Sequence, residues 1–285
     1  MSNRMLPLNA VTYGIRLVEG YHPLQPAAYQ KMLPEMYTQP PAVWRSYIMN
    51  NSLLSMLNVT YLVVEDIAGN LEDIRWPIGR DDEGRPFPVL PSKRGPDAGA
   101  GQSVYRLLAS FGSYSVYENM ISLPRVYSVD RLRPADTVEE VMRGMVSYDM
   151  NPWLEAAVSA GELQEIGGEG FFPGKLTIME DRPDRISISA NFRGRGFVVL
   201  ADQFYPGWEA YVDGMKTKIY KTNGVLRGVV VPEGEHLLVF RYVPRIVYAS
   251  MVASGFLLVL LAFVLLKNRF RKKRDRGVTG DAHVT

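Results

Sequence analysis

Residues 196–243 read GFVVLADQFYPGWEAYVDGMKTKIYKTNGVLRGVVVPEGEHLLVFRYV, and this stretch decides the fold of the C-terminal half. Short runs of alternating or β-branched residues are separated here by turn-forming residues, a pattern typical of antiparallel strands. Asp213-Gly214 predicts a hairpin turn, and Pro-Glu-Gly-Glu at 232–235 predicts another. With two runs upstream, the predicted strands are 176–179, 185–192, 197–202, 208–212, 216–220, 226–231 and 236–242. Short strands at this density predict a small antiparallel β-sandwich over residues 174–243.

Residues 1–173 carry a mixed α/β pattern instead. An amphipathic stretch at 44–57 leads into an apolar strand at 59–64, and further strands are predicted at 104–108, 113–118 and 125–129. The fold class expected for the whole chain is therefore α+β.

Two helices and one loop complete this N-terminal region. Asp136 is expected to cap a helix over 137–147, TVEEVMRGMVS, because its apolar residues recur at helical spacing. Asn151-Pro152 is expected to open a second, short helix over 153–160, WLEAAVSA. Residues 79–103 are rich in Gly, Pro and charge, which predicts a mobile loop.

Composition excludes several classes of function. The chain has no cysteine, which removes disulfides, thiolate zinc sites and cysteine nucleophiles. Its three histidines, His22, His236 and His283, lie in unrelated segments, so neither a metal site nor a cofactor is predicted. The net charge of +2 comes from the C-terminal tail, because residues 1–266 carry 25 basic and 28 acidic side chains. No nucleic-acid partner is expected for such a body.

Residues 246–266, IVYASMVASGFLLVLLAFVLL, contain no charged side chain. About 20 such residues span the hydrocarbon core of a bilayer, so a transmembrane helix is predicted at 244–266, followed by a basic tail at 267–285. The lipid bilayer is then a partner of this chain. Small residues at helical spacing in this run favour close approach of another membrane helix. The expected membrane-interface residues are Arg241, Arg245, Tyr248, Lys267 and Arg269.

Orientation raises a conflict. Lys and Arg flanking a span stay cytoplasmic, which places the tail inside and the body outside the cell membrane. The N-terminal residues MSNRMLPLNAVTYG, however, do not form a secretion signal. Two interpretations stay open: a tail-anchored cytoplasmic protein, or a body that follows membrane helices of an upstream or separate subunit. The second is favoured.

A family resemblance rests on an ordered series of short motifs. These are Tyr205-Pro206-Gly207-Trp208, Val212-Asp213-Gly214, Asn223, Arg227, Val231-Pro232, Gly234-x-His236 and Tyr242-x-Pro244. Together they resemble the C-terminal region of the YfhO family of bacterial membrane proteins. The upstream segments GYHPLQPAAY, LLSMLNVTYLVV and VYENMISLPRVYSV resemble family segments in the same order.

The resemblance implies a polytopic GT-C type glycosyltransferase that takes sugar from a polyprenyl-phosphate donor and acts on a cell-envelope acceptor. Such enzymes carry an acidic catalytic residue in their first extracytoplasmic loop, for which the resemblance finds no counterpart here. The chain thus looks like an outer domain and last helix without the catalytic bundle, from a truncated or split gene. Its status as an enzyme stays open, and no catalytic residue is assigned.

The candidate binding residues are Asp202, Tyr205, Trp208, Asn223 and Arg227. Aromatic faces beside carboxylate, amide and guanidinium groups suit a sugar, so a cell-envelope glycan or a polyprenyl-phosphate sugar is a candidate ligand. A structural interpretation competes with this one. Tyr-Pro-Gly-Trp suits a tight turn whose backbone donors Asp202 could satisfy, with Trp208 in the core. The alternative function is accordingly a membrane-anchored carbohydrate-binding or structural module without transfer activity.

Overall fold

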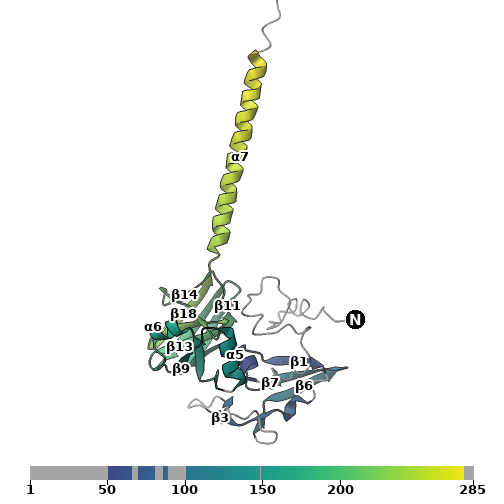
Figure 1. Ribbon diagram of the computed structural model, residues 1–285, viewed down its shortest axis with the longest axis vertical. Helices are drawn as coiled ribbons and strands as arrows, with labels where there is room; N and C mark the ends of the chain where they lie inside the picture. The colour runs from purple at the N-terminus through teal and green to yellow at the C-terminus, as the bar shows by residue number, and fades with distance from the viewer. Residues whose placement is uncertain (1–50, 66–69, 81–85, 89–100, 148, 279–285) are drawn as a thin grey trace, which may run out of the picture. The chain divides into compact units, whose positions relative to one another are not determined.

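The computed structural model describes residues 51–65, 70–80, 86–88, 101–147 and 149–278 (Figure 1). The predicted stretch 44–57 is described only from residue 51, where helix α4 (Asn51–Met56) begins. A three-stranded antiparallel sheet follows in the order β1 (Tyr61–Glu65), β7 (Tyr114–Asn119), β6 (Tyr105–Phe111). These strands confirm the apolar and alternating runs predicted there.

Short elements lie between β1 and β6. They are the 3-10 helix η2 (Leu71–Asp73) and the strands β2 (Arg75–Trp76), β3 (Ile78–Arg80), β4 (Pro86–Pro88) and β5 (Gln102–Ser103). β3 pairs with β4, and β2 pairs with β5. The prediction of one loop over 79–103 is therefore wrong at both ends of that segment, and residues 81–85 and 89–100 lie outside the described residues.

A parallel β-α-β unit comes next, formed by β9 (Arg131–Pro134), α5 (Val138–Val146) and β10 (Glu155–Val158). The predicted helix is present, but its N-cap is Thr137 rather than Asp136. Thr137 and Glu140 form a capping box, in which each side chain bonds the backbone of the other residue. Asp136 instead accepts a hydrogen bond from the Ala160 N–H at 2.9 Å, at the start of α6 (Ala160–Ile166).

The predicted second helix at 153–160 is wrong, because residues 155–158 form the strand β10. Alanine favours helices, but Ala156 and Ala157 are fully enclosed here. The Ala157 N–H donates to the Asn223 side-chain oxygen at 2.7 Å, and the Asn223 N–H donates to the Ala157 carbonyl at 2.7 Å. Asn223 thus pairs with β10 as a neighbouring strand would, and this tertiary contact overrides local propensity.

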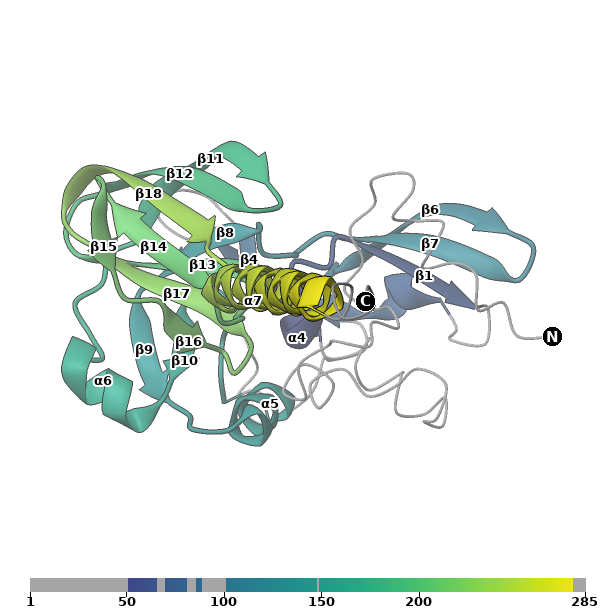
Figure 2. The same ribbon diagram turned by 90° about the horizontal axis from the view of Figure 1, so that it is seen from above.

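The C-terminal half contains two antiparallel sheets (Figure 2). One has the order β11 (Gly174–Arg182), β12 (Arg185–Phe192), β18 (Gly234–Tyr242), β14 (Trp208–Val212), β15 (Met215–Thr217). The other has the order β16 (Tyr220–Thr222), β17 (Leu226–Val231), β13 (Gly196–Gln203), β8 (Val126–Val129). The sheets approach closely, since a Cβ on Gly196 of β13 would lie 2.2 Å from the Phe192 ring of β12. The predicted α+β class with an antiparallel sandwich is confirmed.

Details of the sandwich differ from the prediction. Asp213 and Gly214 have φ of 51° and 80°, as a type I′ hairpin between β14 and β15 requires. The turn before β18, in contrast, links strands of different sheets and is not a hairpin. The single strand predicted at 216–220 is divided into β15 and β16, which also lie in different sheets.

The four-stranded sheet includes a strand from the N-terminal half. β8 pairs with β13 in an antiparallel register from Val126↔Leu200 to Val129↔Phe197. The Gly174 N–H also donates to the Ser128 hydroxyl at 3.0 Å. A domain boundary at residue 174 stays a prediction, but the sheet that follows it depends on residues before it.

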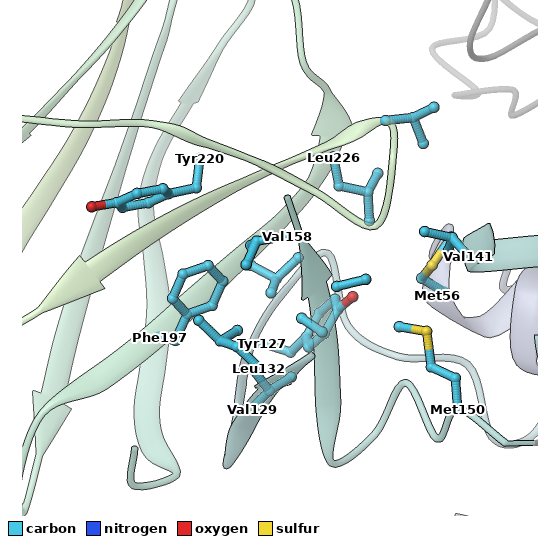
Figure 3. Close-up of a cluster of buried hydrophobic side chains, with 14 of the residues drawn as sticks. Met56, Tyr127, Val129, Leu132, Val141, Met150, Val158, Phe197, Tyr220 and Leu226 are labelled. Atoms are coloured by element: carbon cyan, nitrogen blue, oxygen red, sulfur yellow. The ribbon is translucent and has the colours of Figure 1, made fainter. Parts of the chain in front are cut away.

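One hydrophobic cluster joins the β-α-β unit to this sheet. Figure 3 shows Phe197 beside Tyr220 and Val158, with Met56, Val141 and Met150 further along the cluster. Phe197 also meets Phe171 edge-on, with ring centroids 5.7 Å apart. The core is therefore built jointly from α4, α5, β8, β10, β13 and β17.

Helix α7 (Arg245–Val278) follows the sandwich. Every side chain described between Ser250 and Leu265 is exposed. Among the residues that the structure describes, none of the helices combines the length and the apolarity needed to cross a membrane. A helix is thus present where the sequence predicts one, while its passage through a bilayer stays a prediction. Residues 206–208 and 242–285 form one compact unit, and the rest of the chain forms another.

We expect Asn223→Ala to destabilise the chain by about 2 to 4 kcal/mol, because it leaves the buried Ala157 N–H without its acceptor and puts alanine at φ 51°. Chemical denaturation of the purified protein measures this loss. Asn191→Ala is the matched control, since the Asn191 amide bonds Glu235 at the surface, and it should change the stability by about 0.5 kcal/mol or less. Equal effects of the two variants would contradict the role given to Asn223.

Candidate functional site

The polar centre of the sandwich is an ion pair between Arg125 and Asp202. The Arg125 Nε and Nη2 atoms donate to the two Asp202 carboxylate oxygens at 2.9 and 2.8 Å, and Nη1 donates to Asp181 at 2.7 Å. Asp202 lies in β13 and Asp181 in β11, so one guanidinium connects both sheets. Such a planar two-bond pairing is the strongest geometry available to these groups.

Arg227 of β17 is a second basic neighbour of Asp202. Its Nε donates to the Gln203 carbonyl at 2.9 Å, and its Nη1 is 3.7 Å from the Asp202 carboxylate. Arg227 is only 4% exposed, and burial lowers the pKa of its guanidinium to about 10. Burial also lowers the pKa of Arg125, but the hydrogen bonds to Asp202 and Asp181 outweigh this effect and raise it overall. Both arginines are therefore charged at neutral pH.

Asn223 belongs to a different place. It is fully buried, at φ 51°, and its amide nitrogen lies 3.4 Å from the Tyr127 hydroxyl while its oxygen bonds β10. Burial raises the pKa of Tyr127, which keeps this hydroxyl neutral. Asn223 is thus enclosed by protein and presents no group to a sugar.

The two aromatic candidates have different surroundings. Tyr205 is 42% exposed. Trp208 is half-buried, with its ring centroid 5.5 Å from that of Tyr242. Gly207 between them has φ 100°, as the third position of a Pro-Gly turn requires. The predicted turn is present, but Asp202 bonds Arg125 instead of the turn's backbone, and Trp208 is not enclosed in the core.

Of the five candidates, the structure brings only Asp202 and Arg227 into one cluster. Arg125, which sequence reasoning missed, is its central member. It stands 77 positions from Asp202, so no spacing rule could connect them. The available signal was that Arg125 lies in the segment VYENMISLPRVYSV, one of those that resemble the family. Within the described part of the chain, no group of three or more His, Asp or Glu side chains could hold a metal ion.

Most of the expected interface residues lie within α7, near the two ends of its uncharged run. Arg241, next to the last residue of β18, is exposed, and so are Arg245 and Lys267 of α7. The side chains of Tyr248 and Arg269 lie outside those described. Their contact with a membrane stays a prediction.

Residues 177–254 match the family model described as bacterial membrane protein YfhO. Over these residues the chain is similar to the YfhO family. The YfhO match begins in β11 and contains Asp181, Asp202, Asn223 and Arg227, whereas Arg125 precedes it. It confirms the resemblance based on the turn motifs and supports a membrane localisation and a glycosyltransferase-like family context. No curated protein and no solved structure matches the chain significantly.

Two motifs of the YfhO resemblance meet where His236 contacts Asp213. His236 Nδ1 lies 2.6 Å from the Asp213 carboxylate, and Nε2 lies 3.0 Å from the Glu233 carbonyl. Both ring nitrogens face acceptors, which favours the doubly protonated ring. The pKa of His236 is raised, mainly by the hydrogen bond to Asp213 and to a smaller extent by the one to the Glu233 carbonyl. The pKa of Asp213 is lowered, mainly by the hydrogen bond from His236 and to a smaller extent by the one from the Leu237 N–H.

Asp202 provides the carboxylate that lies next to both Arg125 and Arg227. Asp202→Asn leaves Arg125 and the buried Arg227 close together without the shared carboxylate, so we expect a loss of about 2 to 4 kcal/mol in unfolding free energy. Asp181→Asn removes only one, more exposed partner and should cost about 1 kcal/mol or less. Denaturant titration of both variants checks this. Similar losses would show that the cluster does not centre on Asp202.

The His236–Asp213 pair should make the stability of the fold depend on pH. Because the pKa of His236 is raised in the folded state, its contribution to the stability of the fold is complete below the ordinary pKa of 6.5. This contribution is lost as the pH rises through the folded-state pKa. The contribution of Asp213 is present above 3.8 and is lost as pH falls through its lowered pKa. We therefore expect His236→Asn to lower the melting temperature more at about pH 5.5 than at about pH 8.5. Asp213→Asn, which tolerates the positive φ, should give the same pattern. A difference independent of pH would exclude a charged pair.

Proposed function

We propose that this chain is the extracytoplasmic domain and membrane anchor of a YfhO-type glycosyltransferase. Its donor would be a polyprenyl-phosphate sugar and its acceptor a cell-envelope polymer. Sugar transfer itself would take place in membrane helices outside the described residues. The sandwich would then support and position those helices through α7.

The extent of the YfhO match carries this proposal. It does not end with the sandwich at Tyr242 but continues to residue 254, which lies inside α7. The YfhO family model therefore includes both the sandwich strands and the first turns of α7. A soluble binding module would need no such continuation.

The side chains of α7 support insertion into a bilayer. Large apolar residues are exposed along it, including Met251, Phe256, Leu258, Leu261 and Leu265. An exposed apolar surface of this length marks an interaction with a membrane or another protein. The basic residues from Lys267 onward favour a cytoplasmic tail, which places the sandwich outside.

The polar cluster favours a structural role of the sandwich over sugar binding. Asp202 is engaged by Arg125 and Arg227, and Asn223 is enclosed beside β10. Binding a sugar at these groups would require breaking these contacts. We therefore assign the cluster to the stability of the domain.

Anchoring is tested by charge in α7. Leu258→Arg combined with Leu261→Arg places two guanidinium groups near the middle of the uncharged run, at a cost of about 5 to 7 kcal/mol to insertion. We expect the wild-type chain to stay in the membrane fraction after alkaline carbonate extraction and this variant to be released. Met179→Arg combined with Met215→Arg, at exposed apolar positions of the sandwich, should behave as wild type. Release of the wild-type chain would contradict the anchor.

The glycosyltransferase role is tested in the bacterium that carries the gene. Deletion should remove one sugar from an envelope polymer, as measured by carbohydrate analysis of purified envelope. Wild-type protein should restore it, and the variant with two arginines in α7 should not. An envelope with unchanged sugar composition after deletion would overturn the proposed role.

A further inference from the structure

The turn Pro206-Gly207 and Trp208 form one compact unit with α7 and the residues that lead into it. The Val243 N–H donates to the Gly207 carbonyl at 2.6 Å, which ties the turn to the chain just before the helix. Gly207 is required at this point, because a Cβ would lie 2.8 Å from the Tyr242 ring and the backbone has φ 100°. The turn is therefore built to bring Trp208 and Tyr242 together at the start of α7.

The two rings are positioned near the end of the apolar run. Their centroids are 5.5 Å apart at an interplanar angle of 48°, and both side chains are half-buried. Ile246, where the uncharged run begins, is four positions after Tyr242, and this length of chain spans at most about 14 Å. Arg245, the first residue of α7, is exposed between them.

We propose that Trp208 and Tyr242 form an aromatic anchor that inserts into the headgroup region of the bilayer at the outer end of α7. This rests on the proposed function, in which α7 spans the membrane. Trp and Tyr have apolar rings with one polar group, and this combination is stable where hydrocarbon meets water. The interfacial layer is about 5 to 8 Å thick on each side of the hydrocarbon core. Trp208 and Tyr242 lie close enough to the apolar run of α7 to reach this layer. The exposed Arg245 guanidinium would meet lipid phosphates at the same depth.

This assignment gives Trp208 a role that neither sugar stacking nor core packing provides. A core tryptophan would be enclosed, and a sugar platform would present an open face with polar groups beside it. Trp208 instead packs on a second aromatic ring in the unit that contains α7.

The test uses the full chain in vesicles of phosphatidylcholine and phosphatidylglycerol, with lipids brominated at a shallow chain position as fluorescence quenchers. Trp208→Phe keeps the ring packing and removes the indole. Trp153→Phe is the matched control, because Trp153 is also half-buried and its indole donates to the Ile121 carbonyl at 3.2 Å. We expect Trp208→Phe to abolish most of the quenching by shallow bromine and Trp153→Phe to leave it unchanged.

The outcomes separate the anchor from the span. Unchanged quenching in Trp208→Phe, with the protein still resistant to carbonate extraction, would overturn the anchor and leave the membrane helix intact. Extraction of the wild-type chain by carbonate would overturn the span and the anchor together. Circular dichroism of both variants verifies that they are folded, and a misfolded Trp208→Phe would be replaced by Trp208→Tyr, for which the same loss of quenching is expected.

Discussion

Two hydrogen bonds between Asn223 and Ala157 hold the halves of the folded body together. They close the end of β10 against the turn between β16 and β17, in the region where Phe197, Tyr220 and Val158 pack. Without them a buried strand would end in unpaired backbone groups. The requirement for a positive φ and a side chain that imitates a backbone amide leaves asparagine as the suitable residue.

The Arg125–Asp202 pair has a similar effect in the four-stranded sheet. It fastens the chain just before β8 to β13 and, through Asp181, to β11. Both contacts connect residues before 174 to strands after it. The N-terminal half therefore contributes the strand β8, the Arg125 ion pair and part of the hydrophobic core to the sandwich.

Sequence patterns predicted what depends on neighbouring residues. Alternation located the sandwich strands, and Asp213-Gly214 specified its hairpin because the turn itself requires positive φ at both positions. Residues 155–158 were misassigned because their strand depends on a partner 66 positions away. The candidate binding residues are divided between separate places for the same reason. Asp202 and Arg227 meet, but Arg125 and the burial of Asn223 follow from tertiary contacts that no spacing within the sequence encodes.

The proposed topology places the sandwich outside the cell, anchored to the membrane by α7. Because the chain has no cysteine, single cysteines report topology without background. Met215→Cys, at a position 72% exposed in β15, and Thr285→Cys in the tail can be reacted with a membrane-impermeant maleimide in intact cells. The account predicts labelling at position 215 in intact cells and at position 285 only after lysis. Labelling at 285 with protection at 215 would contradict it.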